Sequence, residues 1–224
     1  MKTLLHRDDL HYGGFAGLRE HRLVMHSKIF GQHKDPATAD GIGNFLYLAD
    51  AKFNPYGETR MHPHREVDVI SLMVEGKINH EGTLEHGETI NTGEVQVQRA
   101  GGEGFSHNEI NPDSVPNRMI QLWFAPEVAG EKAGYQVFKN SHDKVQRVYG
   151  GRQGGTFESQ TVMEVVNLKK GESHQHPGLF QAYLTKGSAK ASELTLNDGD
   201  FFSDDKLEMK ALEDCQFILI TLDS

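Results

Sequence analysis

Short runs of alternating or mainly apolar residues, closed by turns that contain glycine, dominate the hydrophobic pattern of this chain. Two of the turn signals are Glu75-Gly76 and Thr92-Gly93. Alternation is typical of β-strands, and no segment after Val74 shows the period of 3.6 residues that marks a long amphipathic helix. The pattern therefore predicts an all-β protein, with strand-like runs at residues 44–53, 67–74, 95–98 and 119–124.

The second half of the chain repeats the first half in outline. Gly57-Glu58-Thr59 precedes His62-Pro63, and Gly171-Glu172-Ser173 precedes His176-Pro177 at the same offset. An internal repeat of strand-rich units predicts two similar barrels packed side by side. In this alignment Gly178 takes the place of His64, and no histidine follows His176, so the two copies are not equivalent.

We place the division between the domains at residue 128. Residues 127–134 are rich in small and charged side chains and predict a linker. The expected domains are 1–128, which holds the candidate metal site, and 129–224, which is a degenerate copy. Near the N-terminus, residues 23–25 and 29–30 can each add a strand, and residues 35–41 predict a loop.

Charge and cysteine content narrow the class of protein. The chain has 224 residues and a formal net charge of −9, which argues against nucleic acid or an anionic membrane as its main partner. No run approaches the roughly 18 apolar residues that span a bilayer, and residues 1–9 lack the apolar segment of a secretion signal. The single cysteine, Cys215, fits a packed thiol in a reducing compartment. We therefore expect a cytoplasmic protein.

Two pairs of metal-ligating side chains stand at the ends of residues 62–109. Side chains two residues apart on a strand share one face, so His62 and His64 form one pair and His107 and Glu109 form another. If both pairs look into a small barrel, three imidazoles and one carboxylate converge. This donor set suits Fe(II), Mn(II), Ni(II), Cu(II) or Zn(II) and leaves positions open for catalysis. Glu109 can also accept a proton from a bound substrate, so it is a candidate ligand and general base.

The same residue types have simpler interpretations elsewhere in the chain. A lone His-x-His pair arises by chance among 13 histidines. His174 and His176 form such a pair without a third and fourth donor, and we expect them to be hydrogen-bonded or at the surface. Trp123 lies in an apolar run and is expected in the core. A group of acidic residues lacks the spacing of a calcium loop and predicts a solvated turn, namely Asp198, Asp200, Asp204 and Asp205.

Several segments of the N-terminal half resemble the pirin family of bicupins. The resemblance implies two cupin-type jelly-roll barrels packed side by side, the second matching mainly in layout. It also implies one mononuclear metal ion, Fe(II) ahead of Zn, Ni, Mn or Cu, at the positions of His62, His64, His107 and Glu109. The segments that carry the resemblance are His62-Pro63-His64-Arg65, the Glu75-Gly76 turn, Gly93-Glu94-Val95-Gln96, Ala100-Gly101-Gly102-Glu103-Gly104, His107-Asn108-Glu109 and Gln121-Leu122-Trp123.

The activity that this resemblance implies is that of a metal-dependent dioxygenase similar to quercetin 2,3-dioxygenase. A flavonol, or another small planar aromatic compound, would lose its 3-hydroxyl proton to Glu109 and react with O2, and CO would be released. Asp68 departs from the family, which commonly has Glu at this position outside the ligand set. Apolar residues of the predicted strands can wall the pocket, with Ile70, Leu72, Val97, Phe105 and Met119 as candidates.

Two other functions are compatible with the same donor set. A redox-sensing regulatory protein would bind a protein partner according to the state of its metal and would show no turnover. The pirin resemblance allows this alternative, because eukaryotic members are associated with transcriptional co-regulation. A cupin enzyme that is not an oxygenase, such as an isomerase, would work without O2. Oxygen uptake and redox-dependent partner binding separate the three functions.

Overall fold

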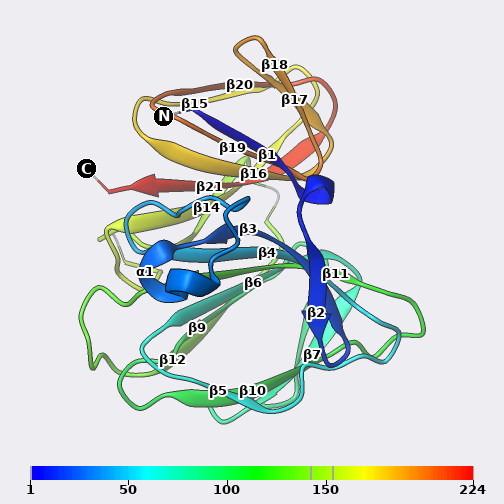
Figure 1. Ribbon diagram of the computed structural model, residues 1–224, viewed down its shortest axis with the longest axis vertical. Coiled ribbons are helices and arrows are strands. Elements are labelled where there is room, and N and C mark those ends of the chain that lie inside the picture. Colours follow the sequence, from blue (N-terminus) through cyan, green and yellow to red (C-terminus); the bar gives the residue numbers. More distant parts are fainter. Residues whose placement is uncertain (1, 142, 153, 224) are drawn as a thin grey trace.

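Two antiparallel β-barrels form the molecule in the computed structural model, which describes residues 2–141, 143–152 and 154–223 (Figure 1). The strands of the first barrel are β2 Tyr12–Phe15, β3 Leu18–Met25, β4 Phe45–Phe53, β5 His62–His64, β6 Asp68–Glu75, β7 Lys77–Gly82, β8 Glu88–Asn91, β9 Val95–Arg99, β10 Phe105–Ile110, β11 Arg118–Phe124 and β12 Gly134–Phe138. They form a seven-stranded sheet of order β12-β9-β6-β11-β4-β3-β2 and a four-stranded sheet of order β5-β10-β7-β8.

The second barrel repeats this plan. Its strands are β1 Thr3–His6, β13 Val145–Tyr149, β14 Thr161–Leu168, β15 Ser173–His176, β16 Phe180–Lys186, β17 Ser188–Ala191, β18 Leu194–Asn197, β19 Asp200–Asp204, β20 Leu207–Ala211 and β21 Cys215–Leu222. They form a six-stranded sheet of order β1-β19-β16-β21-β14-β13 and a four-stranded sheet of order β15-β20-β17-β18. The predicted all-β fold of two similar barrels is confirmed.

Strand pairing crosses the division that the sequence suggested at residue 128. β1, from the N-terminal end, pairs antiparallel with β19 of the second barrel, with Leu5 opposite Phe201. β12, which follows residue 128, pairs with β9 of the first barrel, with Gln136 opposite Val97. Each barrel thus includes a strand from across the predicted division, as the dark blue strand in the upper barrel of Figure 1 illustrates for β1. That residues 1–128 and 129–224 form two separate domains stays a prediction.

The register of the two copies differs from the one that the sequence alignment predicted. In the first barrel β5 pairs with β10, which places His62 opposite His107. In the second barrel β15 pairs with β20, which places His174 opposite Met209 and His176 opposite Leu207. By strand pairing, His174 and His176 therefore occupy the places of the first histidine pair. The alignment of His62 with His176 was wrong by two residues.

An apolar core fills the space between the two barrels. Alternate residues of β6 and β9, among them Ile70, Leu72 and Val97, pack there with residues of the second barrel such as Met163 and Ile218. The intervening residues of the same strands point into the first barrel. The prediction that Ile70, Leu72 and Val97 wall a pocket was therefore wrong, since β6 is apolar on both faces and alternation could not tell which face is inside.

The N-terminal region departs from the predicted strands in one place. Residues 23–25 lie in β3 as predicted, but residues 29–30 belong to the helix α1 Ser27–Phe30, which the 3-10 turn Gly31–His33 follows directly. Another 3-10 turn, Arg7–Asp9, follows β1. The ring of His26 caps this helix by accepting a hydrogen bond from the backbone N–H of Lys28. No helix in the described part of the chain is long and apolar enough to cross a membrane. Cys215 is buried, as predicted, and burial raises the pKa of its thiol to about 11.

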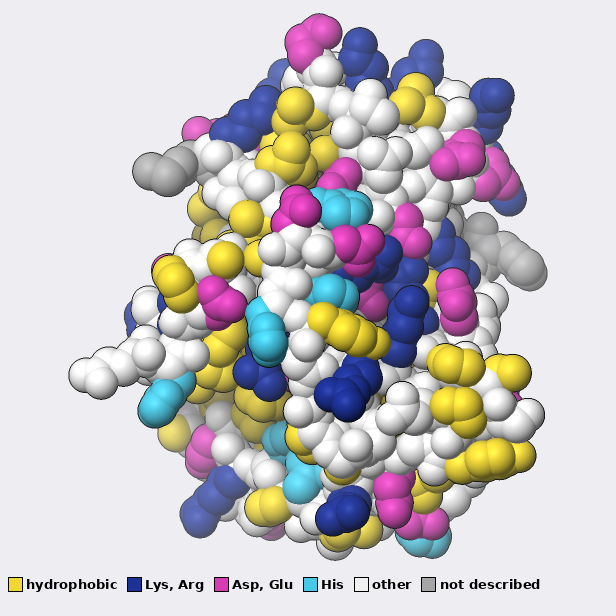
Figure 2. Space-filling view, turned by 45° about the vertical axis from the view of Figure 1, so that its right-hand side comes forward, with side chains coloured by type: hydrophobic (Ala, Val, Ile, Leu, Met, Phe, Trp, Pro, Cys, Tyr) yellow, Lys and Arg dark blue, Asp and Glu magenta, His cyan; other side chains and the backbone are white. Residues whose placement is uncertain are grey.

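A polar network joins the barrels where they meet. Arg118 on β11 donates to Asp50 on β4 at 2.6 Å and to Asp198 at 2.7 Å. Within the second barrel, Nδ1 of His6 on β1 lies 2.7 Å from a carboxylate oxygen of Asp200 on β19. On the face shown in Figure 2, histidine, acidic and basic side chains gather near mid-height of the molecule. Asp198 lies in a turn and is partly exposed, as predicted, although it also pairs with Arg118. The predicted solvated turn was wrong for Asp200, which is buried in β19.

Candidate metal centre

The short strand β5 and its neighbour β10 position three histidines. His62 and His64 alternate with Pro63, so both rings lie on the face of β5 that looks into the first barrel. The antiparallel pairing with β10 then brings His107 directly opposite His62. His62 and His64 are partly exposed, whereas His107 is fully buried. The cluster therefore has a buried inner side and an open outer side.

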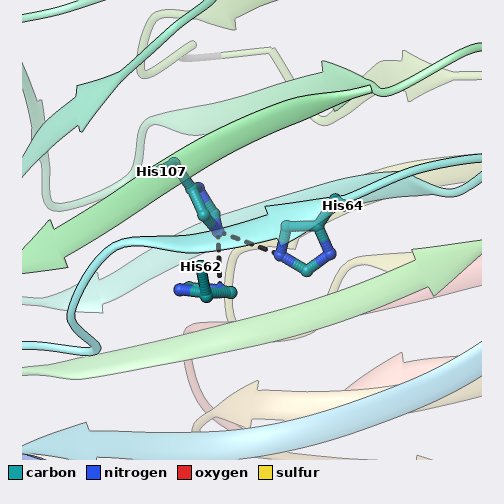
Figure 3. A group of neighbouring side chains, drawn as sticks. All are labelled: His62, His64 and His107. Atoms are coloured by element: carbon teal, nitrogen blue, oxygen red, sulfur yellow. Dashed lines mark hydrogen bonds between the residues drawn. The ribbon is translucent and has the colours of Figure 1, made fainter. Parts of the chain in front are cut away.

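The three rings direct their Nε2 atoms at one another (Figure 3). Nε2 of His107 lies 3.0 Å from Nε2 of His62 and 3.1 Å from Nε2 of His64. Two nitrogens that each bind one ion at about 2.1 Å, at roughly right angles, are about 3.0 Å apart. All three donor atoms lie within 4.8 Å of one another. The geometry therefore fits three imidazoles on one face of a transition-metal ion.

Hydrogen bonds on the far side of two rings favour the tautomer that binds a metal. Nδ1 of His62 lies 2.8 Å from the backbone carbonyl of Arg60, which can only accept, so the lone pair of this ring is on Nε2. Nδ1 of His107 lies 3.1 Å from Nε2 of the Gln98 side-chain amide, and Oε1 of this amide has no partner among the described residues. When the amide is turned over, this oxygen accepts from Nδ1–H of His107.

Burial keeps the inner rings neutral. Loss of solvation, together with a smaller effect of the neighbouring histidines, lowers the pKa of His107 to about 2. The same effect lowers the pKa of His64 to about 4. A neutral imidazole is the form that donates a lone pair to a metal. At neutral pH His64 and His107 are thus ready to bind a cation without first releasing a proton.

Glu109 lies inside the same barrel, but its carboxylate is outside the three-histidine group. One oxygen accepts a hydrogen bond from Oγ of Ser71 at 3.0 Å, and the other accepts from Nε2 of Gln121 at 3.1 Å. Complete burial raises the pKa of Glu109 to about 7, although both hydrogen bonds act in the opposite direction. The structure therefore brings together three of the four predicted ligands. The roles of Glu109 as fourth ligand and as general base stay predictions.

Several interior residues were not singled out from the sequence. His80 on β7 is fully buried, lies opposite Glu109, and has its ring centroid 5.6 Å from that of His107. Gln98 on β9 and Gln121 on β11 contact the predicted site residues. The available signal was the alternation of valine and glutamine at residues 95–98. In a buried strand, one face of this segment is apolar, so the glutamines on the other face indicate a polar interior.

Aromatic rings border the open side of the histidine cluster. The ring of His64 lies 5.2 Å from that of Phe105 and 5.9 Å from that of Trp123, between centroids. Trp123 in turn stacks on Tyr47 at 4.5 Å. Trp123 is thus more than core packing, because its ring contacts a candidate ligand and its buried Nε1 has no partner among the described residues.

The fold and the histidine cluster define a class of protein, a double β-barrel in which one barrel holds three histidines arranged as candidate metal ligands. Residues 18–124 match the Pirin family model. This match confirms the resemblance to the pirin family that was found in the sequence. A Zymomonas mobilis protein, provisionally named as a quercetin 2,3-dioxygenase, is 26% identical over 216 residues, which cover 88% of this chain and 89% of that protein. The quercetin 2,3-dioxygenase of Escherichia coli is 32% identical over 76 residues, or 34% of this chain and 32% of that protein.

Solved structures share the fold of this chain. The bacterial pirin YhhW of Escherichia coli in complex with nickel(II) superimposes with a TM-score of 0.85 and 20% identity, covering 100% of this chain and 99% of that one. A quercetin 2,3-dioxygenase from Acinetobacter baumannii superimposes with a TM-score of 0.74 and 19% identity, covering 99% and 85%. The predicted bicupin architecture is thereby confirmed.

Proposed function

We propose that this protein is a metal-dependent dioxygenase that cleaves a flavonol or a related planar enolic compound with O2 and releases CO. The observation that carries the proposal is the convergence of three imidazole Nε2 atoms inside one barrel. The provisional name of the Zymomonas mobilis relative and the name of the Escherichia coli relative support this substrate class.

The resident ion would be one divalent transition metal per chain, with Fe(II) preferred and Zn, Ni, Mn or Cu as alternatives. Neutral imidazoles suit all of these ions, and the nickel(II) complex of the Escherichia coli pirin supports a site of this chemistry. His62, His64 and His107 would hold the ion, and Glu109 would complete the donor set. When bound, the metal supplies Lewis-acid polarisation of a substrate oxygen.

Glu109 would hold and move the substrate proton. A carboxyl group with a pKa near 7 can take up a proton from an enolic hydroxyl and return it later at neutral pH. Ser71 and Gln121 each bind one carboxylate oxygen and thereby fix its orientation. Deprotonation leaves an electron-rich enolate, the form that reacts with O2, and both oxygen atoms enter the ring-opened product as one carbon departs as CO.

The aromatic border of the cluster favours a flat substrate. Phe105 and Trp123 flank His64 with their rings, so a planar aromatic compound approaching the cluster would stack on apolar faces. Its hydrogen-bonding groups would meet the unpartnered Nε1 of Trp123 and the interior amides. Exclusion of water by these rings protects the enolate from reprotonation.

The test begins with elemental analysis of protein purified without oxygen, followed by O2 uptake and CO release with a panel of flavonols. We expect about one iron-group metal per chain and loss of turnover in His62→Ala. His33→Ala is the matched control, because this histidine is exposed and lies outside the cluster. Absence of turnover in every metal-loaded form would remove flavonols as substrates.

Glu109→Gln separates the two roles proposed for this residue. The amide preserves size and accepts hydrogen bonds on one oxygen only, but it cannot take up a proton. If Glu109 is the base, turnover falls by about 100-fold or more while metal content is retained. A fall in metal content shows instead that its carboxylate is a ligand. Unchanged metal content and turnover would contradict both roles.

A further inference from the structure

The second barrel has its own pair of histidines at the corresponding strand. His174 and His176 lie opposite Met209 and Leu207, and both of these apolar residues belong to the core of the second barrel. Residues directly opposite in an antiparallel pair share one face of the sheet. Both imidazoles therefore point toward the interior of this barrel. The ring of His174 lies edge-on to Phe217 at 5.9 Å between centroids.

A carboxylate faces the pair from the other sheet of the same barrel. Glu164 lies on β14, two residues before Val166, which belongs to the core. Because alternate strand residues share a face, Glu164 also points into the interior of the second barrel. Burial lowers the pKa of His174 and of His176, and the negative charge of Glu164 opposes this effect at both rings.

We propose that His174, His176 and Glu164 form a second, weaker site for a divalent transition-metal cation at the mouth of the second barrel. Two imidazoles and one carboxylate are a donor set that Zn(II), Ni(II) and Cu(II) accept. Neither ring is hydrogen-bonded to another residue in the described parts of the chain, so no existing bond has to be broken at the nitrogens. The site is independent of any activity in the first barrel.

Two features make the second site weaker than the first. Met209 takes the position that His107 has in the first barrel, so strand β20 supplies no third imidazole. Glu164 is also engaged, because its Oε1 accepts a hydrogen bond from Arg147 at 3.4 Å. Among the described residues, only the first barrel gathers three donor atoms within 4.8 Å. Binding here therefore requires Glu164 to leave Arg147 and turn toward the histidines.

Because Arg147 competes with the cation for Glu164, substitutions at these two residues should change cation affinity in opposite directions. Removal of the guanidinium in Arg147→Gln frees the carboxylate and is expected to tighten cation binding several-fold. Removal of the carboxylate in Glu164→Gln is expected to weaken it about tenfold or more, as loss of a ligand does. A pair of histidines acting alone would respond to neither substitution.

The experiment uses the full chain with the first site removed by His62→Ala and His64→Ala, and follows Ni²⁺ by equilibrium dialysis with metal analysis. We expect about one Ni²⁺ per chain to remain, and to disappear in His176→Ala added to this background. Gln175→Ala is the matched control, because its side chain lies on the opposite face of β15. Thermal unfolding of each variant confirms that the chain is folded.

Several results would overturn the proposal. One is the absence of bound Ni²⁺ in the variant that carries His62→Ala and His64→Ala. Another is Ni²⁺ that stays bound after His176→Ala is added. The third is equal Ni²⁺ affinity in Arg147→Gln and Glu164→Gln. If the background variant does not fold, the otherwise unaltered chain is titrated instead. Two equivalents of Ni²⁺, reduced to one by His176→Ala, then support the second site, and one equivalent in both forms contradicts it.

Discussion

The two barrels share their strand order and pairing but differ in what they enclose. In the first barrel β10 directs His107 and Glu109 inward, and both are fully buried. At the corresponding places on β20 the second barrel has Met209 and Ala211, which belong to an apolar core. The same framework thus closes around either a polar centre or a hydrophobic one. The difference teaches that the candidate chemistry depends on a few inward-facing side chains and is not a property of the barrel.

The polar interior lowers the stability of the first barrel. Gln96, Gln98 and Trp123 each bury a polar atom without a partner among the described residues. An unpaired buried donor or acceptor costs about 1–3 kcal/mol. The second barrel carries no comparable group in the part of its interior that the structure describes. We infer that the apolar interior of the second barrel contributes more to the free energy of unfolding than the polar interior of the first barrel, which contains the candidate metal site.

The largest effect on this contrast is expected from Phe217→Ala. Phe217 on β21 is fully buried in the core of the second barrel, so truncation leaves a cavity and lowers the free energy of unfolding by about 3–5 kcal/mol. Urea denaturation measures the loss. In the folded variant, metal bound by the histidine cluster of His62, His64 and His107 should be unchanged, because that cluster lies in the first barrel. A parallel loss of metal would show that the two interiors are not separate.

Met209→His gives the second barrel the third imidazole that it lacks. Without metal, an imidazole in this apolar core should lower the free energy of unfolding by about 1–3 kcal/mol. With Ni²⁺ present, the new ring joins His174 and His176, and binding restores stability by mass action. Thermal unfolding with and without Ni²⁺ provides the measurement, with Met209→Leu as control. A variant that Ni²⁺ does not rescue would show that the two strand pairs are not equivalent.

The contrast also shows which features a sequence reveals. The strands at residues 44–53, 67–74, 95–98 and 119–124 were predictable, because alternation and glycine turns are local signals. The shared face of His62 and His64 was predictable for the same reason, since positions two apart on a strand share a face. Their convergence with His107 was predicted on the further condition that both pairs look into one barrel, which the pairing of β5 with β10 fulfils. The resemblance to the pirin family added the barrel architecture.

The features that sequence did not reveal depend on contacts between distant segments. Ser71 and Gln121 bind Glu109 from two other strands, so they join the site only through the sheet order. The inward face of β6 was not predictable, because the strand lies between two apolar environments. At residues 29–30 a local cap outweighed strand propensity, as the ring of His26 accepts a hydrogen bond from the N–H of Lys28.

Gln98→Leu tests whether the polar interior of the first barrel orients its ligands. The substitution removes the only side-chain partner of His107 Nδ1 in the described structure. The ring is then free to rotate, and metal affinity should fall about tenfold or more. Gln96→Leu is the matched control, since Gln96 lies on the same face of β9 but bonds Tyr135 instead. Competition with a coloured chelator measures both affinities, and equal values would contradict a positioning role.

The smallest effect concerns the strand that crosses from the N-terminus to the second barrel. Asp200 on β19 binds Nδ1 of His6 on β1 and raises the pKa of this imidazole, Asp8 adds to the effect, and Arg7 opposes it. In the unfolded chain the imidazole has its ordinary pKa of about 6.5. The stabilisation is therefore complete below that pH and is lost as the pH rises through the higher pKa of the folded chain.

The measurement compares urea unfolding of the wild type and His6→Gln across the pH range, because all other titrating groups cancel in the difference. The wild type should be more stable by about 0.5 kcal/mol in mild acid, a value typical of a partly exposed pair. The difference should shrink toward zero at alkaline pH. If it grew instead, the neutral ring would be the stabilising form, and β1 would be held to the second barrel by its backbone pairing and apolar contacts alone.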